Sequence, residues 1–321
     1  MTARMKMVDA LCPLCRSEKR EPVFEACDRL KLAPGKFPVV LCLVCGTAYT
    51  SPRPADDELG KCYPGEYWGG RQRGVREVVR AIEERLKENY KIAAVARAGI
   101  LSGRILDVGC GRGEFLALMR ERGFEVEGIE PGAEGARRGR EDFGIDITHG
   151  TLDGASLPVG RYDAVTMWHV LEHLPEPLSA LRAINRALAL GGVLVVALPD
   201  FGSWQAVRFC ERWFGVDAPR HLTHFTRASL GMMLAKAGFS EPAFAPAGAR
   251  YETAMLVRSL WPGLNYRKLD ALEKDLPSKY FYKMGQMALD IGLLPAGAFI
   301  SASGRGVAFT AHASKISPAV F

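Results

Sequence analysis

The sequence predicts an α/β protein built on a doubly wound, mostly parallel sheet. A short apolar strand over 104–108 runs directly into glycines at positions 109, 111 and 113. Strand-like and helix-like segments then alternate along the chain, and the second strand ends in an acid, Glu130. Alternation of this kind favours parallel strands with helices on both faces of the sheet.

The glycine-rich stretch after the first strand indicates a tight turn into a helix. Such a turn lies at the carboxyl end of a strand, where glycines let the backbone approach a nucleotide-like ligand. The dinucleotide-binding fingerprint would need a further glycine at position 114, and the chain has Glu114 there. The turn therefore departs from that fingerprint.

The spacing of Asp107, Gly109, Gly111 and Gly113 resembles the first motif of class I S-adenosylmethionine (SAM) methyltransferases. In that family the loop passes under the methionine moiety, and the acid helps to order it. Glu130 follows about twenty residues later, where a carboxylate can accept both ribose hydroxyls. The resemblance implies a seven-stranded, Rossmann-like sheet, SAM as the cofactor and methyl transfer as the activity.

The elements around the turn follow a regular order. The sequence predicts helices over 113–122, 132–142, 177–189 and 226–237, and strands over 124–129, 145–149, 162–168, 192–199 and 306–312. Thr151 and Leu152 follow the third strand, where methyltransferases commonly contact adenine. Trp168 ends the fourth strand and is also assigned to the cofactor site. The Glu172-His173 pair beyond it resembles the fourth motif of small-molecule methyltransferases.

Composition limits the class of protein. The chain has 321 residues, 48% of them apolar, and a formal net charge of +6, which four zinc-bound thiolates would reduce to about +4. The positive charge is concentrated between Arg71 and Arg104, and we interpret it as the solvated face of an amphipathic helix over 74–98. The first residues lack a secretory apolar region and no run of eighteen apolar residues occurs, so we expect a cytoplasmic protein.

Six of the eight cysteines fall at or before residue 62. Cys12 and Cys15, then Cys42 and Cys45, form two Cys-x-x-Cys knuckles around a segment that suits a small β-ribbon. Four sulfurs favour a structural, tetrahedral Zn²⁺ site with no open position. Two disulfides suit this chain poorly, since no secretory signal is present. Cys27 and Cys62 remain as alternative ligands or ordinary small apolar residues.

Breaker-rich segments suggest the domain organisation. We expect a zinc ribbon over 1–62, a linker and amphipathic helix over 63–99, and a methyltransferase domain over 100–321. Two insertions are predicted in that domain, over about 200–225 and 254–300. The first is aromatic and is expected to cover the substrate entrance. The second would form a helical lid or a dimer contact, or else lie on a membrane surface.

Methylation of an alcohol or an acidic carbon needs a base with a pKa near neutrality, which favours histidine. Four histidines fall in segments expected at the carboxyl edge of the sheet. His221 ranks first, with Arg220 beside it to bind an acid or phosphate, and His169 ranks second. His173 and His224 complete the set.

The ribbon and the catalytic domain together resemble sugar methyltransferases that act on nucleotide-linked sugars or cell-surface glycan precursors, so we expect a small-molecule acceptor. A lipid-linked acceptor would bring peripheral membrane contact. Ribosomal RNA methyltransferases also join zinc to this fold, but residues 1–62 carry ten Lys/Arg against eight Asp/Glu, so nucleic acid is not favoured. A non-catalytic SAM-binding or zinc-dependent interaction protein is the remaining alternative. The methylated atom and the oligomeric state stay open.

Overall fold

The structure is a computed structural model that describes residues 5–30, 32–63, 88–260, 285 and 288–316. The chain divides into two compact units. The ribbon unit comprises Met1–Cys62, Pro199–Ser229 and Pro246–Phe309, and the sheet unit comprises Tyr63–Leu198, Leu230–Ala245 and Thr310–Phe321. The predicted boundaries were linear in sequence, whereas these units are interleaved.

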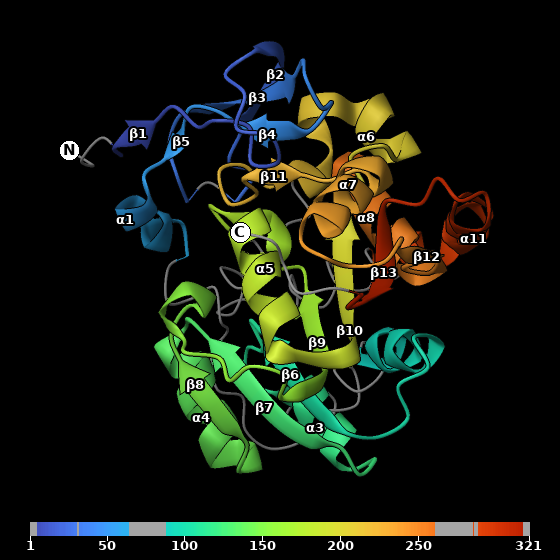
Figure 1. The fold of residues 1–321 in the computed structure, drawn as a ribbon. Coiled ribbons are helices and arrows are strands. Elements are labelled where there is room, and N and C mark those ends of the chain that lie inside the picture. The colour runs from blue at the N-terminus through green and yellow to red at the C-terminus, as the bar shows by residue number, and fades with distance from the viewer. Residues whose placement is uncertain (1–4, 31, 64–87, 261–284, 286–287, 317–321) are drawn as a thin grey trace. The chain divides into compact units, whose positions relative to one another are not determined.

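The sheet unit contains a seven-stranded sheet in the order β12-β13-β10-β9-β6-β7-β8 (Figure 1). Pairings among β6 to β10 are parallel. The strands are β6 (Arg104–Val108), β7 (Glu125–Glu130), β8 (Asp146–His149), β9 (Tyr162–Trp168), β10 (Leu188–Pro199), β12 (Ala243–Pro246) and β13 (Ala308–Ser314). From β6 the chain proceeds first to β7 and β8 and later to β9 and β10 on the other side. This reversal is the topological switch point at which doubly wound sheets bind ligands, and the predicted fold class is confirmed.

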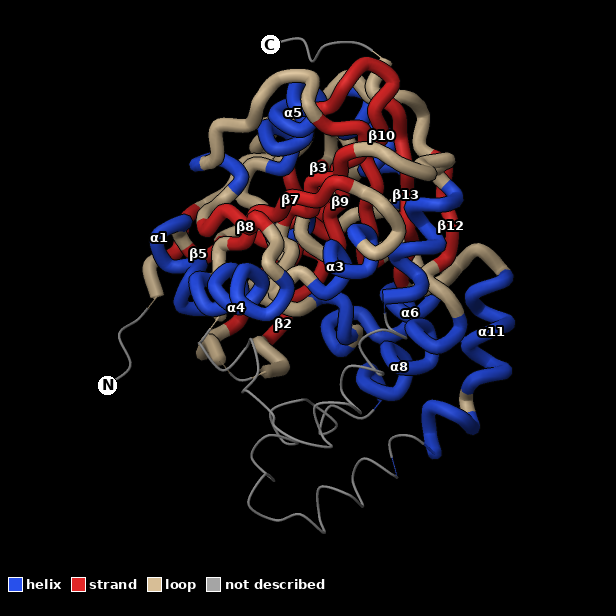
Figure 2. The backbone as a smooth tube through the Cα atoms, turned by 90° about the horizontal axis from the view of Figure 1, so that it is seen from below, coloured by secondary structure: helices blue, strands red, loops and turns tan. Residues whose placement is uncertain are grey.

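Helices cover both faces of this sheet. Figure 2 shows α5 on one side of the strands and α3 and α4 on the other. The helices are α3 (Glu114–Arg120), α4 (Ala133–Phe143), α5 (Pro177–Ala187) and α7 (Arg227–Lys236), together with helical residues 88–97. One buried cluster joins Phe115 and Leu116 of α3 to Ile105 of β6. Apolar side chains that alternate along each strand therefore fill a core on each face.

Of the predicted helices, the one over 177–189 needs correction and the one over 74–98 is only partly described by the structure. The helix predicted over 177–189 ends at Ala187, and β10 begins at Leu188 with a register shift before Val193. Leu188 already has the extended backbone angles φ −68° and ψ 140°, so the helix ends before it and the strand begins. The first half of the helix predicted over 74–98 lies outside the described residues.

The ribbon unit has a four-stranded antiparallel sheet in the order β11-β4-β3-β2. Its strands are β2 (Arg20–Cys27), β3 (Lys36–Cys42), β4 (Ala48–Thr50) and β11 (Thr223–His224), and β1 (Met7–Val8) pairs with β5 (Arg53–Pro54). The ribbon predicted between the two cysteine knuckles is thus β2 and β3. Its fourth strand comes from the predicted aromatic insertion.

Helices complete the ribbon unit. They are α1 (Asp56–Leu59), α6 (Trp204–Phe209), α8 (Ala249–Leu260) and α11 (Leu294–Ala302). Phe37 and Val39 of β3 share a buried cluster with Trp213 and with Met255 of α8. Much of the insertion predicted over 254–300 falls outside the described residues. Among the described helices, none has both the length and the apolar content needed to cross a membrane.

Candidate active site

The glycine turn joins β6 to α3 in the sheet unit. Gly109, Gly111 and Gly113 have φ angles of +71°, +58° and +77°, where side chains other than glycine are strained. A Cβ atom on Gly109 would also stand 2.6 Å from Cγ2 of Val170. Glycine at 109 therefore serves both the backbone angle and the close approach of the segment that follows β9.

Asp107 lies in β6, two residues before the first of these glycines, and is 1% exposed. Its Oδ1 accepts a hydrogen bond of 2.6 Å from the Thr166 hydroxyl on the neighbouring strand β9. Burial raises the pKa of Asp107 to about 7, although the charge of Lys91 and the Thr166 hydrogen bond oppose that rise. The carboxyl group is thus fixed and poorly solvated, and a ligand cation would favour its ionised form.

Glu130 ends β7 and is also 1% exposed. Its Oε2 accepts 2.8 Å from the Gly111 N–H, and its Oε1 accepts 2.7 Å from the Gly132 N–H. Burial raises the pKa of Glu130, while the two backbone donors work against it. The carboxylate bridges the glycine turn and the start of α4, and each oxygen retains a lone pair for a further donor.

The predicted adenine segment follows β8. Leu152 is buried in a short 3₁₀ turn, and Thr151 is exposed beside it. The Gly150 N–H donates 3.0 Å to the carbonyl of Glu130. The segment is therefore anchored to the same residue that bridges the glycine turn.

Trp168 ends β9, and its indole lies in the core. The ring meets Tyr90 and Phe115 edge to face, with centroids 5.9 Å and 5.2 Å away. Its Nε1 is buried and has no hydrogen-bond partner within the described part of the chain. A cofactor that contacted the indole would therefore meet a ring that already packs against Tyr90 and Phe115.

Lys91 was not among the predicted site residues. Its Nζ lies 5.8 Å from the Phe115 ring centroid and 5.7 Å from that of Trp168, and 2.8 Å from an oxygen of Glu88. The basic run over 71–104 was interpreted as a solvated face, and that interpretation is wrong for Lys91, whose side chain is 18% exposed. The apolar spacing of 92, 95 and 98 could have placed Lys91 at the buried side of its helix.

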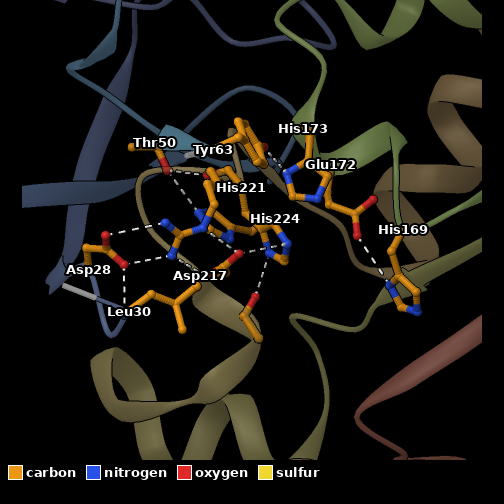
Figure 3. A network of polar contacts seen from close by, with 12 residues as sticks. Asp28, Leu30, Thr50, Tyr63, His169, Glu172, His173, Asp217, His221 and His224 are labelled. Atoms are coloured by element: carbon orange, nitrogen blue, oxygen red, sulfur yellow. Dashed lines mark hydrogen bonds and ion pairs between the residues drawn. The ribbon is translucent and has the colours of Figure 1, made fainter. Parts of the chain in front are cut away.

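Two predicted histidines follow β9 in the sheet unit (Figure 3). His169 adopts φ +57°, and its Nδ1 lies 3.4 Å from Oε1 of the buried Glu172. His173 Nδ1 lies 2.8 Å from the hydroxyl of Tyr63, the first residue of the predicted linker. Both imidazoles are therefore held at the carboxyl end of a central strand, as expected.

The other two histidines belong to the ribbon unit. His221 Nδ1 is 2.8 Å from the Gly215 carbonyl, and His224 Nε2 is 3.1 Å from the Thr50 hydroxyl (Figure 3). Their exposed fractions are 8% and 3%. Each ring thus has a packing and hydrogen-bonding role within that unit.

The prediction that Arg220 binds an acid or phosphate of the substrate is wrong. Its side chain is fully buried, and its guanidinium contacts Asp28 at 2.7 Å and Asp217 at 2.6 Å. Asp28 also accepts the backbone N–H groups of Leu30 and Ala33. Arg220 is a structural partner of these acids, because its donors are directed to them inside the ribbon unit.

The four knuckle cysteines come together at one end of the ribbon. Ligand atoms of Cys12, Cys15, Cys42 and Cys45 all lie within 4.8 Å of one another. The Cys12–Cys45 and Cys15–Cys42 sulfurs are 3.4 Å and 3.5 Å apart. These separations exceed the roughly 2 Å of a disulfide and approach the roughly 3.8 Å between sulfurs around tetrahedral zinc.

The thiols of this cluster differ in their surroundings. Burial raises the pKa of Cys12 and of Cys15. Burial would also raise the pKa of Cys42, but N–H groups of Cys45 and Val44 and the neighbouring thiols outweigh it and hold that pKa at about 7. Cys27 and Cys62 lie outside the group, exposed and buried respectively. Of the predicted alternatives, the two knuckles are the set that the fold gathers.

A doubly wound sheet with an acid-flanked glycine turn at its switch point defines the class of nucleotide-cofactor-binding α/β proteins. Residues 68–240 match the methyltransferase-domain family, which is more than half of the chain. The chain belongs to this family.

Curated relatives cover part of the chain. The ubiquinone biosynthesis O-methyltransferase of Psychrobacter cryohalolentis is 31% identical over 161 residues, which are 45% of this chain and 63% of that protein. The protein of the same name from Aeromonas salmonicida is 36% identical over 105 residues, 31% of this chain and 44% of that protein. This chain therefore spans less than two thirds of the length of these relatives.

Among solved structures, a SAM-dependent methyltransferase from Archaeoglobus fulgidus is similar at 20% identity and a TM-score of 0.46, over 71% of this chain and 94% of that one. The family assignment rests on the sequence match.

Proposed function

We propose that this protein transfers a methyl group from SAM to a hydroxyl oxygen of a small molecule. The observation that carries the proposal is Glu130, whose carboxylate is fixed by the N–H groups of Gly111 and Gly132 beside the glycine turn. An acid held in this way at the switch point suits the two ribose hydroxyls of a nucleoside. The match to the methyltransferase-domain family supports methyl transfer over other nucleoside chemistry.

The residues around the turn fit the parts of SAM. Asp107, buried and close to the turn, offers a negative charge that suits the amino group of the methionine moiety. Gly109, Gly111 and Gly113 leave the backbone accessible, and Thr151 and Leu152 would meet the adenine. SAM supplies a methyl group on a sulfonium, and the transfer depends on alignment and exclusion of water.

His169 and His173 are the proposed candidates for the base that accepts the hydroxyl proton. Both follow β9, and each is oriented by a named partner, Glu172 or Tyr63. A base oriented by a second group is the usual arrangement in general base catalysis. His221 and His224 stay weaker candidates, because the Gly215 carbonyl and the Thr50 hydroxyl hold their rings within the ribbon unit.

Oxygen as the methylated atom is supported by the names of the curated relatives, which are O-methyltransferases. A nucleotide-linked sugar is a second candidate acceptor. The cysteine cluster favours it, because the combination of a zinc ribbon with this domain resembles sugar methyltransferases. We also propose that the cluster holds a structural Zn²⁺, because four sulfurs leave no open position for catalysis.

Methyl transfer is tested by incubating the full chain with SAM and separate acceptors, a polyhydroxylated aromatic compound and a nucleotide-linked sugar. Mass spectrometry of the acceptor and detection of the demethylated cofactor are the two readouts. Both signals with one acceptor, lost in His169→Ala or in His173→Ala and kept in His312→Ala, support the proposal. Cofactor binding with no methylated product from any hydroxyl compound would instead favour a non-catalytic SAM-binding protein.

The RNA alternative is separated by a binding titration at two salt concentrations. A phosphate-binding protein loses affinity steeply as salt rises. The near balance of charge over residues 1–62 predicts weak binding. Tight, strongly salt-dependent binding of ribosomal RNA would favour the RNA alternative.

A further inference from the structure

An uncharged stretch near the end of the ribbon unit has an unusual distribution of exposed side chains. Residues 291–302 include α11 and contain no charged residue. Phe299 is 77% exposed, Ile291 64% and Leu294 38%. Pro295 and Ala298 are exposed as well. These five residues are here called the α11 face. An exposed apolar surface of this kind is typical of a site that contacts another protein or a membrane.

The opposite side of α11 is already used for packing. Gly297 and Ser301 are buried, and a Cβ on Gly297 would stand 2.1 Å from the Thr253 hydroxyl and 2.8 Å from the Ala249 carbonyl of α8. Figure 2 shows α8 beside α11. Leu293, one turn earlier, packs against the buried cluster of the ribbon unit. The side of α11 that carries Gly297 and Ser301 therefore packs against α8. A rotation that buried the α11 face would break this packing.

The charged residues of the neighbouring elements are mostly arginines. In 204–212, 249–260 and 288–305 the cations are Arg208, Arg212, Arg250, Arg258 and Arg305. The acids in the same segments are Glu211, Glu252 and Asp290. Glu252 is buried and accepts hydrogen bonds from Gln205 and Val307, and Asp290 is half-buried. Glu211 is thus the one exposed acid in these segments, and the exposed charge is positive.

A tryptophan lies at one end of this surface. Trp204, 42% exposed, begins α6, and its N–H donates to the carbonyl of Arg305, three residues past the end of α11. Tryptophan and arginine beside an apolar surface are the residues that favour the boundary between lipid tails and headgroups.

We propose that the α11 face docks this protein on an anionic lipid bilayer, with the flanking arginines at the headgroups. The size of the face favours a bilayer over a second copy of the chain. Residues 291–302, which include a turn at Leu293 and the nine residues of α11, cover a strip about 18 Å long and 10 Å wide. This is far less than the ~800 Å² per partner of a stable interface. A shallow apolar insertion combined with basic residues is sufficient for reversible binding to a membrane surface.

The test is co-flotation of the full chain with vesicles of phosphatidylcholine alone or mixed with phosphatidylglycerol. Wild type should bind the mixed vesicles at low salt. It should lose much of that binding at high salt, because salt screens the attraction between the arginines and the anionic headgroups. Phe299→Glu should weaken partition about tenfold. Leu190→Glu, on a residue 85% exposed in the sheet unit, is the matched control and should bind as wild type does.

Two further measurements complete the test. Arg250→Gln with Arg305→Gln should remove the preference for phosphatidylglycerol and the salt dependence together. Brominated lipid should quench the fluorescence of the wild type more than that of Trp204→Phe. Equal binding by wild type and Phe299→Glu, or no binding to mixed vesicles at low salt, would overturn the proposal. Concentration-dependent dimerisation in light scattering that Phe299→Glu abolishes would assign the face to a second copy and overturn it as well.

Discussion

At the scale of single residues, the candidate site depends on two buried carboxyl groups held in different ways. Glu130 is fixed by two backbone donors. Asp107 instead accepts a hydrogen bond from the Thr166 hydroxyl and is attracted by the positive charge of Lys91. The sequence motif predicts both acids at the turn. It contains no information on Lys91, which reaches this region through the packing of the helix before β6.

The pKa of Asp107 predicts a pH-dependent stability. Burial raises that pKa from an ordinary 3.8 to about 7, so folding favours the protonated carboxyl. The contribution of this group is fully present below about pH 4 and is lost as the pH rises through 7. Asp107→Asn stays neutral and should gain on wild type as the pH rises, by about 2–3 kcal/mol between pH 5 and pH 8. Urea unfolding of both proteins at pH 5 and pH 8 measures the difference.

Asp146→Asn is the control for this experiment, since Asp146 is exposed at the start of β8. Its difference from wild type should be small at both pH values. A stability difference between Asp107→Asn and wild type that does not change with pH would contradict the burial argument.

At the scale of elements, the glycine turn combines backbone conformation with close packing. Gly109→Ala places a Cβ at φ +71° and 2.6 Å from Val170. Gly191→Ala has a similar φ of +76° but meets nothing within 4 Å, so it should cost only the about 1–2 kcal/mol of the strained angle. Gly109→Ala should cost more than Gly191→Ala in urea unfolding.

The double variant Gly109→Ala with Val170→Ala identifies the source of that excess. If the clash with Val170 is responsible, the double variant should recover most of the difference between the two alanine variants. A Gly109→Ala protein no less stable than Gly191→Ala would show that the turn has room for a side chain.

The ribbon is the second element that makes a sharp prediction. Cys42→Ser removes one of four clustered sulfurs, so bound zinc should fall from one ion per chain to well below half, and the melting temperature should drop by several degrees. Cys27→Ser is the control, because Cys27 is exposed and outside the cluster. Metal analysis and a thermal melt measure both effects. Full zinc content in Cys42→Ser would mean that another residue completes the site.

At the scale of the whole chain, local pattern predicts the sheet unit well and the ribbon unit only in part. Alternating apolar residues and glycine turns define β6 to β10, because each element has its own periodicity. The addition of β11 to β4 could not be predicted, since a two-residue strand has no period. Likewise, Arg220 pairs with Asp28 across 192 positions, and no local signal connects them. Arg220 was predicted to bind substrate because it is next to His221 in the sequence, and nothing in the sequence indicated its distant partner Asp28.

This distant pair makes a stability prediction. Arg220→Met removes the cation that contacts the buried Asp28 and the half-buried Asp217, and it should cost about 3–5 kcal/mol in unfolding free energy. Lys36→Met breaks an exposed ion pair with Glu25 and should change stability little. Chemical denaturation of both variants measures the contrast, and equal stability would show that Arg220 is not the link between these segments.

The central claim is that Glu130 and the glycine turn bind the nucleoside of SAM, and calorimetric titration with SAM tests it most directly. Wild type should bind one SAM per chain. Glu130→Ala should bind at least about tenfold more weakly, because charge-assisted hydrogen bonds to the ribose are lost. Glu134→Ala, on an acid four residues later whose side chain is 45% exposed, should bind like wild type. No heat of binding with wild type, or equal affinity in Glu130→Ala with its fold intact, would contradict the account.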